Sequence, residues 1–325
     1  MATTSNVFIA AAALCISVMT SGACAQTYPA KPIHLIVPFT PGGTTDILAR
    51  ALGQKWTEAW GKQIIVENRP GAGGSVAAEA VARSPADGYT IMVGHIGTLA
   101  VNPSLYPKLG YDPLKSFAPI TLIATVPSVL VVHPGIPANS VAELIAYVKA
   151  NPGKLNYSTG GNGSAAHLAM EYFKLRTGTN IVHIPYKGTA PAVTDLLGGQ
   201  VAMSMTGAPA LMPHVQAGRL KALGVTSLKR IPALPQIPTI SEAGVAGFEA
   251  TQWYGIVAPA GTPPEIIRML NAETVKIMAT TDMEERLASD GAIGTTDTPE
   301  EFAAHIKAEI ARWGEVVRNA RMKAE

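Results

Sequence analysis

Cysteine is almost absent from this chain of 325 residues, in which Cys15 and Cys24 are the two examples. Both lie in a segment typical of an export signal, where an apolar run from Val7 to Met19 is followed by small residues that end at Ala25. Cleavage after Ala25 predicts a mature chain without a disulfide bond or a reactive thiol, located in the periplasm. A lipoprotein with Cys24 as the attachment point is the alternative, although Ser21-Gly22-Ala23 lacks the bulky aliphatic residue that lipid attachment normally needs.

Clusters of one charge are also missing. The 25 basic and 23 acidic residues are spread along the chain, which argues against partners such as nucleic acid or an anionic membrane surface. Beyond the signal no apolar run is long enough to suggest a membrane span. The histidines show no spacing typical of metal ligands and have no cysteine beside them, so we expect no metal and no cofactor; they are His34, His95, His133, His167, His183, His214 and His305.

Short apolar runs alternate with segments of helical periodicity from residue 33 onward. The pattern predicts strands at 33–37, 64–67 and 90–94 and helices at 45–60 and 76–83. A second unit repeats the plan, with strands at 155–158, 181–184, 201–205 and 222–226 and helices at 141–150, 164–176 and 210–217. Such repeated units predict an α/β fold with mostly parallel sheets flanked by helices.

Two segments are expected to cross between two sheets. The apolar run 121–133 is long enough to leave one sheet and enter another, and residues 253–259 can carry the chain back. Three helices, at 264–279, 283–290 and 299–321, then close the sequence. We therefore predict a two-lobed clamp of the periplasmic-binding-protein type, with residues 26–124 and 250–325 in lobe 1 and residues 125–249 in lobe 2.

Two Gly-rich loops, at 38–46 and 158–167, each stand between a predicted strand and a predicted helix. Glycine lets the backbone approach a ligand, and the first amides of a helix point outward with the positive end of its dipole. The pair of loops therefore predicts an anion site without a basic side chain. The alternative is an ordinary capped turn, with Thr44 or Thr45 as the cap of the first helix.

The second loop also admits two enzymatic interpretations. Residues 161–166 match the G-x-G-x-x-G/A pattern of dinucleotide sites, but the strand 181–184 does not end in the acid that would hold a ribose. Ser164 and His167 could be nucleophile and base, yet Ser164 lacks a G-x-S-x-G elbow. We prefer Ser164 as helix cap and ligand donor and His167 as a polar wall of a cleft, with a locally hydrogen-bonded histidine as the alternative.

A third loop, 185–195, contains Lys187, which is the cation that we place near the cleft. In their order along the chain, several motifs together resemble the Bug family, the solute-binding receptors of tripartite tricarboxylate transporters: Val37-Pro38-Phe39, Pro41-Gly42-Gly43, Glu67-Asn68-Arg69-Pro70-Gly71-Ala72-Gly73-Gly74, Asn162-Gly163-Ser164, Pro185-Tyr186-Lys187-Gly188 and Ala258-Pro259-Ala260-Gly261-Thr262-Pro263. The chain departs from the pattern of that family at three positions. Ala77 is often Gly in the family, Ala86 is often Pro, and many members have an acid at the position of Thr206.

The resemblance implies a monomeric, non-enzymatic periplasmic protein that captures a small carboxylate between its lobes and delivers it to the membrane permease subunits of a tripartite transporter. A ligand-sensing receptor for a membrane kinase and a periplasmic hydrolase that uses Ser164 and His167 are the alternatives. Asp46 is expected to order its loop rather than to touch an anion. The predicted ligand-binding residues are Phe39, Thr40, Gly42, Gly43, Thr44, Thr45, Asp46, Asn162, Gly163, Ser164, His167 and Thr189.

Overall fold

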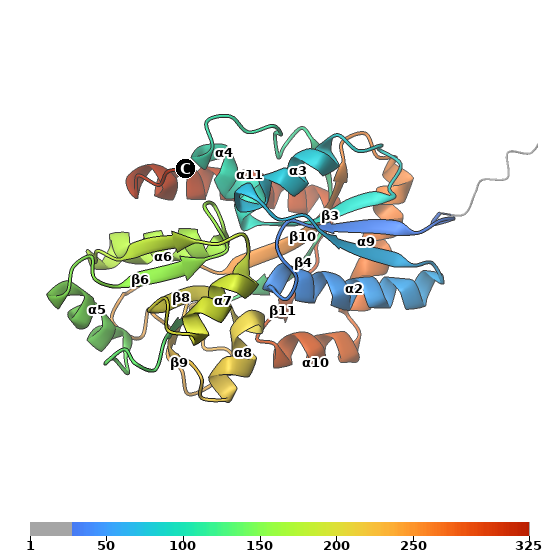
Figure 1. The fold of residues 1–325 in the computed structure, drawn as a ribbon. Coiled ribbons are helices and arrows are strands. Elements are labelled where there is room, and N and C mark those ends of the chain that lie inside the picture. Colours follow the sequence, from blue (N-terminus) through green and yellow to red (C-terminus); the bar gives the residue numbers. More distant parts are fainter. Residues whose placement is uncertain (1–27, 325) are drawn as a thin grey trace, which may run out of the picture. The chain divides into compact units, whose positions relative to one another are not determined.

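The computed structural model describes residues 28–324 (Figure 1). The predicted signal peptide at 1–25 lies outside the described residues. Backbone contacts divide the chain after Ala30, and the compact unit that begins at Lys31 carries the described helices and strands. Within the described residues, no helix combines the length and the apolar character needed to cross a membrane.

One sheet, called sheet A below, has six strands in the order β11-β4-β10-β3-β1-β2. The parallel part pairs β1 with β2 and β3, whereas β10 runs antiparallel to both β3 and β4, and β11 runs antiparallel to β4. The helices that pack on this sheet are α2 (Thr44–Trp60), α3 (Ser75–Ala82), α9 (Pro264–Met278) and α11 (Pro299–Asn319). The strands are β1 (Ile33–Val37), β2 (Ile64–Asn68), β3 (Thr90–His95), β4 (Phe117–Val126), β10 (Gln252–Pro259) and β11 (Ile293–Gly294).

The other sheet, sheet B, has five strands in the order β7-β6-β8-β5-β9. Strand β6 is parallel to β7 and β8, and β5 is antiparallel to β8 and β9. The helices that pack against it are α6 (Ala165–Thr177), α7 (Thr189–Leu197) and α8 (Ala208–Gln216). The strands are β5 (Ser128–Val132), β6 (Asn156–Thr159), β7 (Val182–Pro185), β8 (Met203–Gly207) and β9 (Lys221–Val225).

The predicted α/β class with two sheets is confirmed, but both sheets are mixed rather than mostly parallel. Repeated strand–helix–strand units make parallel pairs, as they do for β1, β2 and β3. The crossing strands β10 and β5 enter the two sheets from the opposite direction, so each makes antiparallel pairs on both sides. Alternation of strands and helices in the sequence does not reveal that reversal.

The predicted crossing at 121–133 is confirmed, because β4 in sheet A is followed after Pro127 by β5 in sheet B. The return crossing ends in β10, as predicted for 253–259. The division of the chain into lobes at 124 and 250 stays a prediction.

The helices lie close to their predicted positions, and the stretch 97–105 adds a π-helical turn (Gly97–Val101) and the short helix α4 (Asn102–Leu105) that the sequence pattern did not predict. The longer helices are α2 (Thr44–Trp60), α3 (Ser75–Ala82), α5 (Val141–Ala150), α6 (Ala165–Thr177), α7 (Thr189–Leu197), α8 (Ala208–Gln216), α9 (Pro264–Met278), α10 (Thr281–Ser289) and α11 (Pro299–Asn319).

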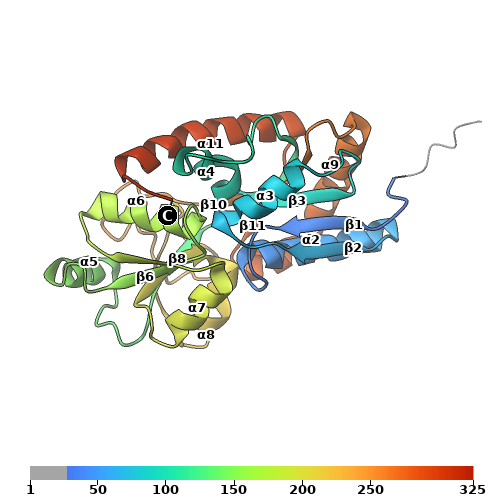
Figure 2. The same cartoon turned by 45° about the horizontal axis from the view of Figure 1, so that its top comes forward.

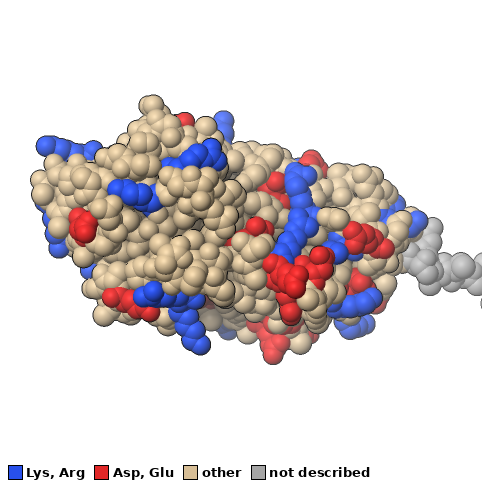
Figure 3. All heavy atoms as spheres, turned by 90° about the horizontal axis from the view of Figure 1, so that it is seen from below, with Lys and Arg blue, Asp and Glu red and all other residues tan. Residues whose placement is uncertain are grey.

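Helix α11 runs above sheet A and reaches α6, which packs against sheet B (Figure 2). It begins with a capping box between Thr298 and Glu301, as the sequence Thr-Pro-Glu-Glu predicts. Near its other end, the Trp313 ring makes an edge contact with Tyr172 of α6, at 6.3 Å between centroids. Acidic and basic side chains are interspersed on the face shown in Figure 3.

Candidate functional site

The carboxyl ends of parallel strands from both sheets meet at one place. Strands β1 and β3 of sheet A and strands β6 and β8 of sheet B lead into the segments that line it. Ligand sites of α/β proteins form at such strand ends because the connecting loops there open into helix N-termini. The two sheets thus present their Gly-rich loops to a common pocket.

Helix α2 contributes an N-terminus without a side-chain cap. Its N-cap is Gly43, which makes no side-chain hydrogen bond, so the alternative of a cap from Thr44 or Thr45 is wrong. Both threonines are buried, at 3% and 4% exposure, and both line the pocket. The Thr44 hydroxyl has no hydrogen-bond partner within the described residues. A buried hydroxyl without a partner costs free energy, which a ligand acceptor in the pocket would recover.

Asp46 holds the loop before α2, as predicted. Its carboxylate accepts hydrogen bonds from the Gly42 amide, the Arg50 guanidinium and the Asn68 amide, each at 2.9 Å. Burial by itself would raise the pKa of Asp46, but these hydrogen bonds outweigh it, and the pKa lies below its usual value. Gly42 can take its place in this loop because it adopts a left-handed conformation, with φ of 80°.

Helix α6 begins at the second loop. Ser164 is its N-cap and accepts a hydrogen bond from the His167 amide, which confirms its predicted role as a cap. The His167 ring turns back to the loop, where Nδ1 accepts from the Gly163 amide at 3.2 Å. That ring also stacks on His183 with 4.2 Å between centroids. Burial lowers the pKa of His167 to about 4, so the ring is neutral at pH 7.

Helix α7 supplies a third N-terminus, again without a side-chain cap, behind Gly188. This glycine permits a close approach between the loops: a Cβ atom there would lie 2.0 Å from the Thr40 hydroxyl oxygen. Thr189 lines the pocket and faces Gly43, whose added Cβ would stand 3.3 Å from the Thr189 Cβ. Three helix N-termini therefore converge, each favourable to an anion by about 0.3–1 kcal/mol when exposed and up to about 2 when partly buried.

The inner pocket has a volume of about 20 Å³, which is room for roughly one water molecule. Strand residues form its floor. Tyr254 donates to the Gln252 side-chain oxygen at 2.6 Å, and the Gln252 amide nitrogen donates to Ser128 at 2.6 Å. The lining residues are Phe39, Thr44, Thr45, His95, Gly160, Ser164, Ala165, Ala166, Thr189, Thr206, Gln252 and Tyr254.

His95 is fixed at the end of β3 with only 3% of its surface exposed. Its Nδ1 accepts from the amides of Gly97 and Thr98 in the π-helical turn, at 3.0 and 3.3 Å. The proton of the neutral ring therefore lies on Nε2, which makes no hydrogen bond within the described residues. Burial lowers the pKa of His95 to about 4. His95 is thus a neutral donor at the pocket.

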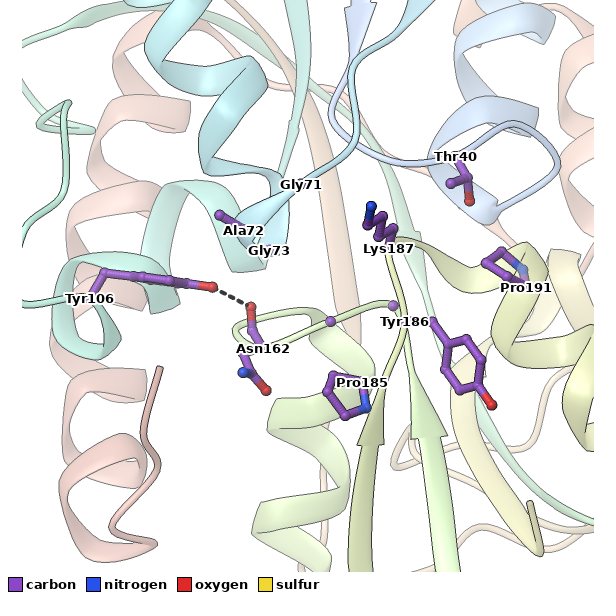
Figure 4. A pocket seen from close by; sticks show the side chains of 12 residues that line it. Thr40, Gly71, Ala72, Gly73, Tyr106, Asn162, Pro185, Tyr186, Lys187 and Pro191 are labelled. Atoms are coloured by element: carbon purple, nitrogen blue, oxygen red, sulfur yellow. Dashed lines mark hydrogen bonds between the residues drawn. The ribbon is translucent and has the colours of Figure 1, made fainter. Parts of the chain in front are cut away.

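An outer cavity of about 650 Å³ adjoins the inner pocket, and Gly160 lines both. Figure 4 shows Lys187 projecting into it between Thr40 and the segment Gly71–Gly73. The Tyr106 hydroxyl donates to the Asn162 carbonyl at 2.9 Å across this cavity (Figure 4). Because Tyr106 follows α4 and Asn162 follows β6, this hydrogen bond joins the two sheets' loops.

Seven of the twelve predicted site residues line one of the two cavities. Phe39, Thr44, Thr45, Ser164 and Thr189 line the inner pocket, and Thr40 and Asn162 line the outer cavity. The other five line neither cavity and belong to the loops around the pocket or to the first turns of their helices: Gly42, Gly43, Asp46, Gly163 and His167.

Three further residues, His95, Gln252 and Tyr254, line the inner pocket although no sequence motif indicated them. All three are polar residues in or at the end of otherwise apolar strands, which is a usable signal, but only the tertiary structure shows that they share a pocket with the loops.

The geometry does not support the hydrolase alternative, since the Ser164 hydroxyl accepts from the His167 backbone while the imidazole bonds to Gly163. No group of three or more metal-ligating side chains is present among residues 28–324. A polar, buried pocket with helix N-termini and neutral donors is suited to hold a small anion.

The fold and this enclosed polar pocket define a solute-binding protein of the periplasmic-binding type. The chain belongs to the tripartite tricarboxylate transporter family receptors, whose family model, TctC, matches residues 48–322. It is 41% identical over 319 residues to Protein BugT of Bordetella pertussis strain Tohama I. The matched region covers 98% of this chain and 96% of BugT.

Solved structures share the fold. Rpa4515 of R. palustris with adipate has a TM-score of 0.89 and 41% identity, covering 91% of this chain and 99% of that one. The periplasmic binding protein BugD has a TM-score of 0.88 and 38% identity, covering 92% and 100%. MatC of Rhodopseudomonas palustris with bound malate has a TM-score of 0.86 and 33% identity, covering 89% and 100%. The predicted family is confirmed.

Proposed function

We propose that this protein is a periplasmic receptor without catalytic turnover, which binds a small dicarboxylate between its two sheets and delivers it to the permease subunits of a tripartite transporter. The observation that carries the proposal is the convergence of three helix N-termini on a buried pocket in which the Thr44 hydroxyl lacks a partner. The adipate and malate bound to similar proteins support the ligand class.

The binding mode follows from the two cavities. One carboxylate of the ligand accepts hydrogen bonds from first-turn amides and from threonine hydroxyls in the inner pocket. Because that pocket holds about 20 Å³, the rest of a ligand of four to six carbons needs the outer cavity or a separation of the two sheets. The second carboxylate then lies on the side of Lys187. Helix termini contribute at most about 6 kcal/mol together, whereas micromolar binding needs roughly 8, so hydrogen bonds must supply the remainder.

A thermal-shift screen of the refolded protein tests this function. Refolding removes any ligand that co-purifies. The panel contains dicarboxylates of four to six carbons and the diamide of each, which keeps the length but removes both charges. At about 100 times the dissociation constant, a ligand stabilises the folded state by roughly 2.7 kcal/mol, equivalent to several degrees. A shift with diamides and none with the acids would overturn the anion site.

Ser164→Ala separates binding from hydrolysis. A receptor loses the cap of α6 and one ligand donor, which weakens affinity by about 1–3 kcal/mol. A hydrolase would instead show turnover of carboxylate esters that disappears in this variant by orders of magnitude. Turnover by the wild type that depends on Ser164 would refute the receptor assignment.

We also infer export and a permease partner. Export predicts a mature N-terminus at Gln26, which sequencing of the protein from the periplasmic fraction would establish; an N-terminus at Cys24 would instead indicate a lipoprotein.

Crosslinking in cells with ligand present should recover a membrane permease subunit. Recovery of a membrane kinase in its place would favour the sensing role.

A further inference from the structure

The charges around the two cavities point to a narrower ligand class. Among the described residues that line either cavity, none is an aspartate or a glutamate, and Lys187 is the single charged side chain. The inner pocket is lined by hydroxyl groups, an amide, a neutral imidazole and apolar side chains. A group of positive charge would therefore find no counter-charge there.

Asp46, which directly follows the pocket-lining Thr44 and Thr45, cannot take that role. It does not line either cavity, and both of its oxygens already accept hydrogen bonds, including one from the cationic Arg50. His95 cannot substitute for it either, because its Nδ1 is occupied as an acceptor by two backbone amides and its Nε2 carries the proton. The described residues that line the two cavities thus offer an ammonium group no anionic acceptor.

We infer that the site selects dicarboxylates without an amino group, and that Thr206 is a residue that sets this preference. An α-ammonium group stands one carbon away from the bound carboxylate, so it would enter the inner pocket beside the positive ends of α2, α6 and α7. There it would lose water and gain neither a carboxylate nor a favourable dipole. An α-hydroxyl group of the same size can both donate and accept, and it fits such a pocket. The inference rests on the proposed function.

Thr206 occupies the place from which an acid could reverse the preference. It lies near the end of β8, is 5% exposed and lines the inner pocket. Its hydroxyl makes no hydrogen bond within the described residues, so its replacement breaks no side-chain hydrogen bond. A carboxylate at position 206 would lie on the wall of the inner pocket, which Thr44 at the start of α2 also lines.

The test compares pairs of ligands of nearly equal size by calorimetric titration of the refolded protein. Each pair contains an α-hydroxy diacid and the corresponding α-amino diacid, of four, five and six carbons, at pH 7. In the wild type we expect the hydroxy acid to bind at least about 30-fold more tightly in the pair of the preferred length. Equal or tighter binding of the amino acid would overturn the inference while leaving the proposed function intact. Absence of binding by every diacid would overturn both.

The variant Thr206→Asp should narrow or reverse the ratio within the pair, because it repels the diacid and supplies a counter-charge to the ammonium group. Thr206→Asn keeps the size without the charge and should leave the ratio as in the wild type. Thr281→Asp, in the exposed first turn of α10, adds the same charge away from the site and is the matched control. A ratio in Thr206→Asp equal to that of Thr281→Asp, with both variants folded by circular dichroism, would remove Thr206 from the explanation. If Thr206→Asp does not fold, the wild-type ratio alone decides the inference.

Discussion

Replacing Asp46 by asparagine should reduce both stability and affinity, although the two side chains have the same shape. In the wild type, one carboxylate oxygen accepts from Gly42 and Arg50, and the other accepts from Asn68. An asparagine has one oxygen and one amino group at these places. Whichever way it turns, a donor of the wild-type network faces another donor.

Asn68 cannot rotate to relieve this conflict at low cost. Its amide nitrogen also donates to the Phe39 carbonyl at 3.0 Å, and its oxygen accepts from Arg50 at 3.1 Å. The variant therefore loses a charge-assisted hydrogen bond and leaves one group unpaired, each worth roughly 1–3 kcal/mol. Because the Arg50 side chain is 51% exposed, solvent screens its ion pair with Asp46. We therefore expect the free energy of unfolding to fall by about 3 kcal/mol in total.

Thermal unfolding and urea unfolding measure this loss, which corresponds to a midpoint lowered by about 6–12 °C. Dicarboxylate affinity should fall by about tenfold, since Asp46 fixes the loop that presents Thr44. Glu58→Gln removes the same charge from an exposed position of the same helix and should change neither quantity. If Asp46→Asn unfolds at the same temperature and urea concentration as Glu58→Gln, the loop does not depend on this network.

Three further predictions concern the pocket and the histidines. Thr44→Val should leave the ligand-free protein at least as stable as the wild type, because the buried hydroxyl costs free energy without a partner, but weaken dicarboxylate binding about tenfold or more in calorimetry; an unchanged affinity would remove Thr44 from the site. Gly188→Ala should weaken binding by a similar factor, since its Cβ would lie 2.0 Å from the Thr40 hydroxyl, whereas Gly198→Ala, with its nearest atom at 3.6 Å, serves as the control and should bind normally. The pKa of His95 lies at about 4 in the folded protein against 6.5 for the free group, so its contribution to stability is present above pH 6.5 and is lost as the pH falls toward 4. Urea unfolding of the wild type should lose about 3 kcal/mol more over that range than a His95→Gln variant, and parallel pH profiles would contradict this.

Local signals predicted much of this fold. The helix expected at 141–150 is α5 residue for residue, because a serine cap, helical periodicity and a following Asn-Pro agree with one another. The cap at Ser164 and the bond from Gly42 to Asp46 were likewise readable from sequence, since these partners lie within four residues, whereas Asn68 lies 22 positions from Asp46. The apolar run 121–133 indicated the crossing between sheets for the simple reason that one buried strand does not need so many residues.

The features that escaped prediction depend on contacts distant in sequence. The direction of β10 and β5 in their sheets is decided by strands that are distant in sequence, since Gln252 of β10 pairs with Val126 and Val129 of β5 pairs with Val225. The pairing of Tyr106 with Asn162 spans 56 positions, and the floor contact of Gln252 with Ser128 spans 124. No periodicity carries such information. The pocket was therefore predicted from its helix N-termini but not from its floor.

The central feature of the proposed site is an anion held by helix termini and hydroxyl groups, and one calorimetric experiment tests it most directly. The refolded protein is titrated with the dicarboxylate of four to six carbons that stabilises it most, and separately with the diamide of the same acid. We predict a dissociation constant in the micromolar range or below for the dicarboxylate and an affinity lower by at least about a hundredfold for the diamide. Comparable affinities for the two compounds would contradict an anion site at these helix termini.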